Sequence, residues 1–131
     1  MTADMYGAVR PAVEELLTEG TLVVVLRGAG DVAFGAGSDI SEFPTRRMDE
    51  QAELFDAIEH DAWAALAEIP VSVIAAIHGP CMGGGIAMAL QCDIRVAADD
   101  ATFAVPPARL GLAYPEDALS RLVDLVGPAQ T

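Results

Sequence analysis

The sequence predicts an α/β fold in which short apolar strands alternate with helices. Residues 21–26 and 71–77 are β-branched, nearly continuous apolar runs, as expected of strands buried on both faces. The segments that precede them, residues 5–17 and 49–67, repeat apolar side chains at helical spacing. Alternation of this kind favours a layered structure of parallel strands joined by helices.

The first helix carries its apolar side chains on one stripe, and Gly20 provides its stop. Pro11 lies inside the pattern and lacks a backbone N–H, so it should kink the helix or move its start. The stripe comprises Met5, Val9, Ala12, Val13, Leu16 and Leu17.

A short helical turn at residues 39–43, ended by Pro44, precedes the second helix. Pro70 marks the end of that helix. Its expected buried stripe consists of Leu54, Ile58, Ala62, Ala65 and Leu66.

A glycine-rich turn at residues 78–85 follows the second strand. We find no linker or repeat, so residues 1–131 are expected to form one domain. The remaining expected elements are a helix from this turn to about Gln91, strands at 94–97 and 102–105, and a helix at 118–126 after the Pro106-Pro107 break.

Composition and charge exclude several classes of function. The 131 residues carry a formal charge of −13, which argues against a nucleic-acid partner. All seven basic residues are arginine, so Schiff-base and P-loop lysine chemistry are excluded. No apolar run approaches the roughly 20 residues of a membrane helix, and residues 1–5 show no basic region followed by an apolar one, so no secretory signal is expected. We therefore expect a cytoplasmic protein without a membrane partner.

The cysteines and histidines fit no zinc spacing, and no metal site is expected. Cys81 and Cys92 are interpreted as small buried hydrophobic residues. His60, on a helix, and His78, at the end of a strand, are interpreted as packed or surface residues rather than catalytic ones.

Two glycine clusters each join a buried strand to the start of a helix. They are Gly35-Ala-Gly-Ser-Asp39 and Gly83-Gly-Gly85. Glycine lets the backbone approach a ligand closely, and the free N–H groups of a first helical turn attract negative charge. Two such turns facing each other would make an oxyanion hole, and each donor there can be worth about 3 kcal/mol to a developing oxyanion.

The two clusters in their surroundings resemble the crotonase superfamily, the enoyl-CoA hydratase/isomerase group. The matching stretches are residues 33–40 and 74–85, continuing through 89–95 to Phe103 and residues 110–112. The resemblance implies a crotonase-type (ClpP/crotonase-like) core of repeated strand–helix units that binds an acyl-CoA thioester. Typical members are about twice as long, so it also implies a truncated member without the N-terminal strands and C-terminal helices.

The resemblance implies that the thioester carbonyl oxygen lies between the N–H groups of Ser38 and Gly84. A backbone N–H group is retained when the side chain changes, so these donors do not depend on the side chains at the two positions. The resemblance implies that stabilisation of a thioester enolate is the step shared by the family. Residues implied to contact the substrate are Ala36, Asp39, Ile40, Met82, Gly83, Pro107 and Leu112.

The chain departs from the family at the two glutamates that hydratases use as acid and base. Ala87 and Pro107 occupy those positions, and neither side chain can transfer a proton. Isomerisation or decarboxylation is therefore expected in preference to hydration. Glu116 and Asp117 stand where some family isomerases place a carboxylate, and Tyr114 matches a tyrosine of the methylmalonyl-CoA decarboxylase branch.

Coenzyme A enters this expectation as part of the substrate, and no separate cofactor is expected. Its phosphates need cations, for which Arg46 and Arg47 beside the first glycine turn are the candidates. The expected partners are further copies of the chain, as in the trimers of the family, or a complementary chain.

Two other interpretations remain open. Residues 28–33 fit the G-x-G-x-x-G/A pattern of dinucleotide-binding enzymes, but Gly35 and Gly37 would break the helix that this pattern requires. The stronger alternative is a catalytically inactive crotonase remnant, or a subunit that binds acyl-CoA without turning it over.

Overall fold

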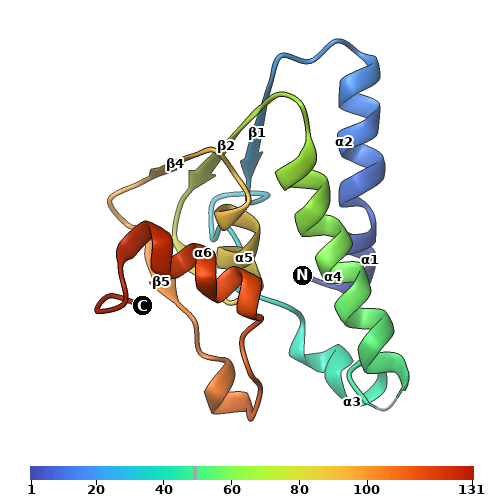
Figure 1. The fold of residues 1–131 in the computed structure, drawn as a ribbon, viewed down its shortest axis with the longest axis vertical. Helices are drawn as coiled ribbons and strands as arrows, with labels where there is room; N and C mark the ends of the chain where they lie inside the picture. Colours follow the sequence, from blue (N-terminus) through green and yellow to red (C-terminus); the bar gives the residue numbers. More distant parts are fainter. Residues whose placement is uncertain (49) are drawn as a thin grey trace.

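A computed structural model describes residues 1–48 and 50–131 (Figure 1). It confirms the predicted α/β class, while the expected start of the second helix at Asp49 lies outside the described residues. No helix in these ranges is both long and apolar enough to span a membrane. The elements are α1 (Ala3–Gly7), α2 (Val9–Thr18), β1 (Val23–Arg27), η1 (Ile40–Glu42), α3 (Phe43–Arg46), α4 (Glu50–Glu68), β2 (Ser72–Ile77), β3 (Pro80–Met82), α5 (Gly84–Leu90), β4 (Ile94–Ala97), β5 (Thr102–Ala104), η2 (Pro107–Leu110) and α6 (Glu116–Val126).

The strands form two parallel sheets. β1, β2 and β4 make a three-stranded sheet in the order β1-β2-β4, with Val25 opposite Ile74 and Ile74 opposite Ile94. β3 and β5 pair separately, with Cys81 opposite Phe103. Strand β3 was not predicted, because Pro80 and the glycines after it are typical of a turn rather than a strand.

The helices gather on one side of the three-stranded sheet, where α4 lies beside α1 and α2 (Figure 1). The core lies between them, and the strands contribute Val24, Val73, Ala75 and Ile77 to it. The other sheet face is largely open, with Val25 57% and Val96 59% exposed. The prediction of strands buried on both faces is therefore wrong, because helices cover one face alone.

The N-terminal helical segment is divided into two helices. α1 ends at Gly7 and α2 begins at Val9, which places Pro11 in the first turn of α2, where its missing N–H costs little. The helical pattern is thus interrupted at Ala8, where the prediction was that Pro11 would kink the helix or move its start. Tyr6 rather than Met5 faces the core, since Tyr6 is 1% and Met5 54% exposed.

The buried stripe of α4 is rotated relative to the predicted one. Phe55, Glu59 and Trp63 are buried, whereas Leu54 is 56% exposed. Ala62, Ala65 and Leu66 are buried as predicted. The rotation places a glutamate on the buried stripe, and this glutamate belongs to the site described below.

The two glycine turns are in backbone contact. The Met82 N–H donates to the Gly35 carbonyl at 2.8 Å, and the Gly35 N–H donates to the Pro80 carbonyl at 3.1 Å. A Cβ atom on Gly85 would lie 2.4 Å from the Gly35 carbonyl oxygen, closer than real Cβ atoms approach backbone. Glycine at position 85 therefore lets the start of α5 lie against the first turn.

Gly85→Ala should lower the free energy of unfolding by about 1–3 kcal/mol, as overpacking a well-packed interior does. Gly7→Ala is the matched control, because a Cβ atom there meets nothing within 4 Å. This control in a helix should be neutral or stabilising by about 0.5–1 kcal/mol. Urea unfolding followed by circular dichroism measures both, and equal stability of Gly85→Ala and the wild type would contradict the contact.

Both cysteines are free and buried, as predicted. Burial raises the pKa of Cys81 to about 12 and that of Cys92 to about 11. An unfolded thiol has a pKa near 8.5, so these groups favour the folded state fully below about pH 8.5, and this contribution is lost as the pH rises toward the folded values.

The folded chain should therefore resist thiol alkylation at about pH 9, where an exposed cysteine is largely thiolate. Iodoacetamide labelling followed by mass spectrometry measures this, with the urea-unfolded chain as the control. Labelling of the folded chain at the rate of the unfolded chain would show that the thiols are not buried.

Candidate functional site

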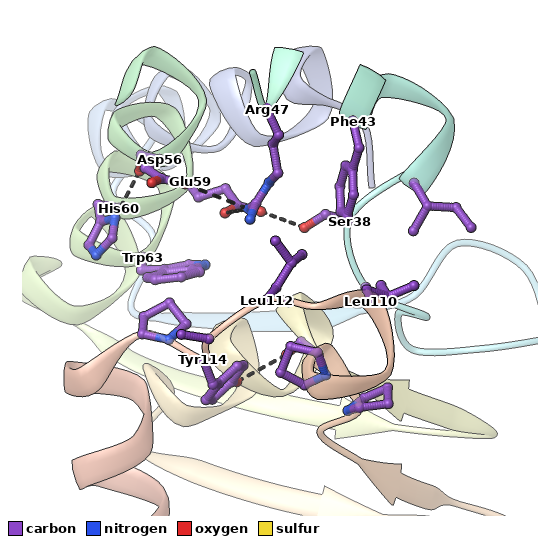
Figure 2. Close-up of a pocket in the computed structure, with 18 of the residues that line it drawn as sticks. Ser38, Phe43, Arg47, Asp56, Glu59, His60, Trp63, Leu110, Leu112 and Tyr114 are labelled. Carbon is purple, nitrogen blue, oxygen red and sulfur yellow. Dashed lines mark hydrogen bonds and ion pairs between the residues drawn. The ribbon is translucent and has the colours of Figure 1, made fainter. Parts of the chain in front are cut away.

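A cleft of about 1020 Å³ lies where the two glycine turns, α4 and the segment from η2 to α6 meet. One wall carries Ser38, Phe43, Arg47 and Glu59, and the opposite wall carries Leu112 (Figure 2). The other lining residues are Ala36, Gly37, Ile40, Asp56, His60, Trp63, Gly83, Gly84, Pro106, Pro107, Leu110, Ala113, Tyr114, Pro115, Glu116, Asp117 and Ser120.

The glycine turns bring two backbone N–H groups to this cleft. Gly37 has φ +99° and Gly83 has φ +50°, backbone conformations that favour glycine. A Cβ atom on Gly37 would lie 3.7 Å from the Gly84 nitrogen, so the two turns lie side by side. Within residues 1–48 and 50–131, neither the Ser38 N–H nor the Gly84 N–H donates to a protein acceptor. Both donors are thus available to a ligand oxygen.

The Ser38 side chain is held by two partners. Its hydroxyl donates to Glu59 Oε1, and its oxygen lies 3.1 Å from the Tyr6 hydroxyl (Figure 2 shows the Glu59 contact). Glu59 is 4% exposed and is the one acidic side chain in the buried class among the described residues. Sequence analysis missed Glu59 and Tyr6 as parts of the site.

Arg47 neutralises the buried carboxylate. Its Nη2 pairs with Glu59 Oε2 and lies 3.8 Å from Asp56 Oδ1. The guanidinium carbon lies 5.0 Å from the ring centre of Phe43 and 4.6 Å from that of Phe55, within cation–π range. Burying a carboxyl group without partners is costly, and Glu59 has both an ion pair with Arg47 and a hydrogen bond from Ser38.

The tyrosines at the site stay protonated. Tyr114 donates its hydroxyl to the Gly83 carbonyl at 3.1 Å, beside the second glycine turn (Figure 2). Burial raises the pKa of Tyr114 and that of Tyr6 well above the ordinary value, because it disfavours the phenolate. Neither phenol is therefore a proton acceptor at neutral pH.

Ala36, Ile40, Gly83, Pro107 and Leu112 all line the cleft, as do Ser38, Gly84 and Tyr114. Two residues implied to contact the substrate lie outside it. Asp39 caps η1, where the side chain and N–H of Ser41 lower the pKa of its carboxyl group. Met82 lies in β3, and its N–H binds Gly35.

Glu116 and Asp117 line the cleft from the first turn of α6, where acidic residues favour the helix dipole. Both are exposed, unlike Glu59. Asp117 Oδ2 lies 3.9 Å from His60 Nε2, and its Oδ1 accepts from the Ala118 N–H at 2.8 Å. The two carboxylates therefore lie at the solvent side of the cleft.

The two arginines suggested for the coenzyme A phosphates are engaged with carboxylates. Arg46 lies 3.7 Å from Glu42 and 3.8 Å from Asp4, and Arg47 is turned toward Glu59. These contacts place Arg47 beside the buried carboxylate of the cleft. Among the described residues no group of three potential ligands could hold a metal ion.

Comparison with known proteins places this geometry in a family. The model of the enoyl-CoA hydratase/isomerase family matches residues 2–131. A probable enoyl-CoA hydratase from Mycobacterium leprae is 40% identical over 113 residues, which are 82% of this chain and 40% of that protein. The fatty acid oxidation complex subunit alpha from Shewanella frigidimarina is 37% identical over 89% of this chain and 18% of its own length.

Solved structures share the fold. An enoyl-CoA hydratase/carnithine racemase from Magnetospirillum magneticum superposes with a TM-score of 0.92 at 37% identity, covering 99% of this chain and 49% of that one. An enoyl-CoA hydratase from Bacillus anthracis gives a TM-score of 0.80 at 32% identity, covering 94% of this chain and 49% of that one. The chain spans about half the length of these solved relatives. It spans less than half the length of the two curated relatives.

The match over residues 2–131 and the fold shared with the solved relatives lead to one conclusion. The chain belongs to the enoyl-CoA hydratase/isomerase family of the crotonase superfamily.

Proposed function

We propose that residues 1–131 form an acyl-CoA-binding domain that holds a thioester carbonyl oxygen between the N–H groups of Ser38 and Gly84. The observation that carries the proposal is the contact between the two glycine turns, which brings to one cleft two N–H groups that have no protein acceptor among the described residues. Donors fixed in this way stabilise the negative charge of an enolate oxygen without reorganising. No separate cofactor takes part.

The remaining surface of the cleft supports the same ligand class. Ile40, Leu110 and Leu112 offer an apolar lining for an acyl chain.

Isomerisation of a 3-enoyl thioester fits the charges better than decarboxylation. Asp56, Glu59, Glu116 and Asp117 line the cleft, and Arg47 is the one arginine among its lining residues. A substrate that carries its own carboxylate would meet this excess of negative charge. Proton transfer within a neutral acyl chain involves no substrate carboxylate and so no repulsion of this kind. It passes through an enolate, whose oxygen two N–H donors can stabilise.

Calorimetric titration with straight-chain acyl-CoA thioesters, using free coenzyme A as the reference, tests the binding site. Gly84→Pro removes the N–H at a helix position that tolerates proline, and Gly84→Ala retains it. A Cβ atom there would lie 2.1 Å from the Tyr6 hydroxyl, so both variants belong in a Tyr6→Phe background. We expect the proline variant to bind roughly 10-fold more weakly than the alanine variant, equivalent to one hydrogen bond of about 1.4 kcal/mol.

Circular dichroism of each variant provides the folding control. Equal affinities of the folded Gly84→Pro and Gly84→Ala variants would contradict the role of the Gly84 N–H in the oxyanion hole. A folded wild-type chain that binds no thioester more tightly than free coenzyme A would contradict the proposed function itself.

The second candidate is an acyl-CoA-binding subunit, or an inactive family member, that binds without turnover. Ala87 and Pro107 favour it, because neither residue supplies the carboxylate that family hydratases use. Conversion of a 3-enoyl-CoA into its conjugated 2-enoyl isomer, followed by ultraviolet absorbance, distinguishes the two. Binding without conversion would support the subunit.

We also propose that the open face of the β1-β2-β4 sheet is covered by a second copy of the chain or by a complementary chain. Val23, Val25, Ile94 and Val96 are each about half exposed there, between 48% and 59%. Contiguous apolar patches of this kind are typical of protein interfaces.

Val25→Lys should shift the purified chain toward the monomer in sedimentation velocity, because a charge on this face cannot be buried without a partner. Val32→Lys is the control, since Val32 is 83% exposed and lies outside the strands. A wild-type chain that is monomeric at all accessible concentrations would exclude self-association and leave the complementary chain.

A further inference from the structure

We propose that Glu59 and Ser38 form the proton-transfer pair of the cleft, with the Ser38 hydroxyl as the group that meets the substrate. This inference rests on the proposed function, since it needs a thioester bound at the N–H groups of Ser38 and Gly84. The juxtaposition that carries it is a buried carboxylate hydrogen-bonded to the side chain of the residue that offers an oxyanion donor.

The candidates for proton transfer in the cleft can be compared by position. The hydratase positions hold Ala87 and Pro107. Glu116 and Asp117 are exposed, and Tyr114 is engaged with the Gly83 carbonyl. Glu59 is the buried acidic group among the described residues, and it lies behind Ser38 rather than at the solvent side.

Neighbouring side chains hold Glu59 and Ser38 in a fixed geometry. Arg47 pairs with Oε2, while Oε1 accepts from Ser38. Phe43 and Phe55 lie against the Arg47 guanidinium and keep it in place. The Tyr6 hydroxyl lies 3.1 Å from the Ser38 oxygen and holds that oxygen beside Gly84. The carboxylate and the hydroxyl are therefore fixed next to both proposed oxyanion donors.

The step is balanced within the site. The Cα–H bond of the bound thioester breaks, and its electron pair moves into the enolate, whose oxygen lies between the two N–H groups. The proton passes to the Ser38 oxygen as the Ser38 proton passes to Glu59 Oε1. Reversal returns a proton to Cα, which gives exchange with solvent, or to Cγ of a 3-enoyl chain, which gives the 2-enoyl isomer.

Hydrogen–deuterium exchange at Cα tests the proposal. The 131-residue chain is incubated in D₂O with a straight-chain 3-enoyl-CoA, and loss of the Cα proton signal is followed by NMR, with binding measured separately by calorimetry. Glu59→Gln retains the shape of the side chain and an oxygen for Ser38, but it cannot take up the proton. We expect exchange to fall at least 100-fold while affinity changes less than about threefold.

Ser38→Ala is the second variant. It removes the hydroxyl and retains the backbone N–H, so it should also bind normally and lose exchange. Glu53→Gln, an exposed change on the same helix α4 outside the cleft lining, is the control that should alter neither measurement.

Exchange by Glu59→Gln or Ser38→Ala within a few-fold of the wild type would overturn the proposal. An equal loss of affinity and exchange would also overturn the proposal, because it would show that Glu59 only supports the position of the Ser38 backbone. A wild-type chain that binds the thioester without exchange, or that releases free coenzyme A thiol by acyl transfer to Ser38, would also overturn it. Absence of thioester binding in the wild type would instead contradict the proposed function.

Discussion

Backbone-to-backbone contact between the two glycine turns is the constraint on which the rest of the site depends. Residues 80–85 lie so close to Gly35 that Gly85 has no room for a side chain, and hydrogen bonds between Gly35, Pro80 and Met82 fix the spacing. β1 and β2 are parallel neighbours, so the turns that follow them emerge at the same edge of the sheet. The positions of the Ser38 and Gly84 N–H groups follow from this contact.

The second layer of the site is electrostatic. α4 presents Glu59 on its buried stripe, and the cost of burying that charge is offset by Arg47 and the Ser38 hydroxyl. The two phenylalanines at Arg47 come from α3 and α4, so the ion pair also joins these helices. A carboxylate is thereby held beside the glycine turns although the hydratase positions lack one.

Sequence analysis predicted the features that depend on local sequence pattern. It failed for features that depend on contacts with residues distant in the sequence. Apolar runs and glycine clusters located β1, β2 and both turns. The assignment of the Ser38 and Gly84 N–H groups as oxyanion donors came from the family resemblance and stays a prediction. Glu59 was missed because periodicity treats glutamate as exposed, and its partners are distant in sequence. The spacing of Phe55, Glu59, Ala62 and Leu66 at helical intervals was the available signal. The open sheet face could not be foreseen, since a strand pattern does not show what covers it.

The amide NMR signals of Ser38 and Gly84 give the most direct measurement of the central claim, which is that both N–H groups bind one thioester oxygen. In a titration of the isotope-labelled chain with an acyl-CoA thioester, both amide protons should move downfield as they gain an acceptor, and free coenzyme A should not reproduce the change. Saturable thioester binding that leaves both signals in place would contradict the claim.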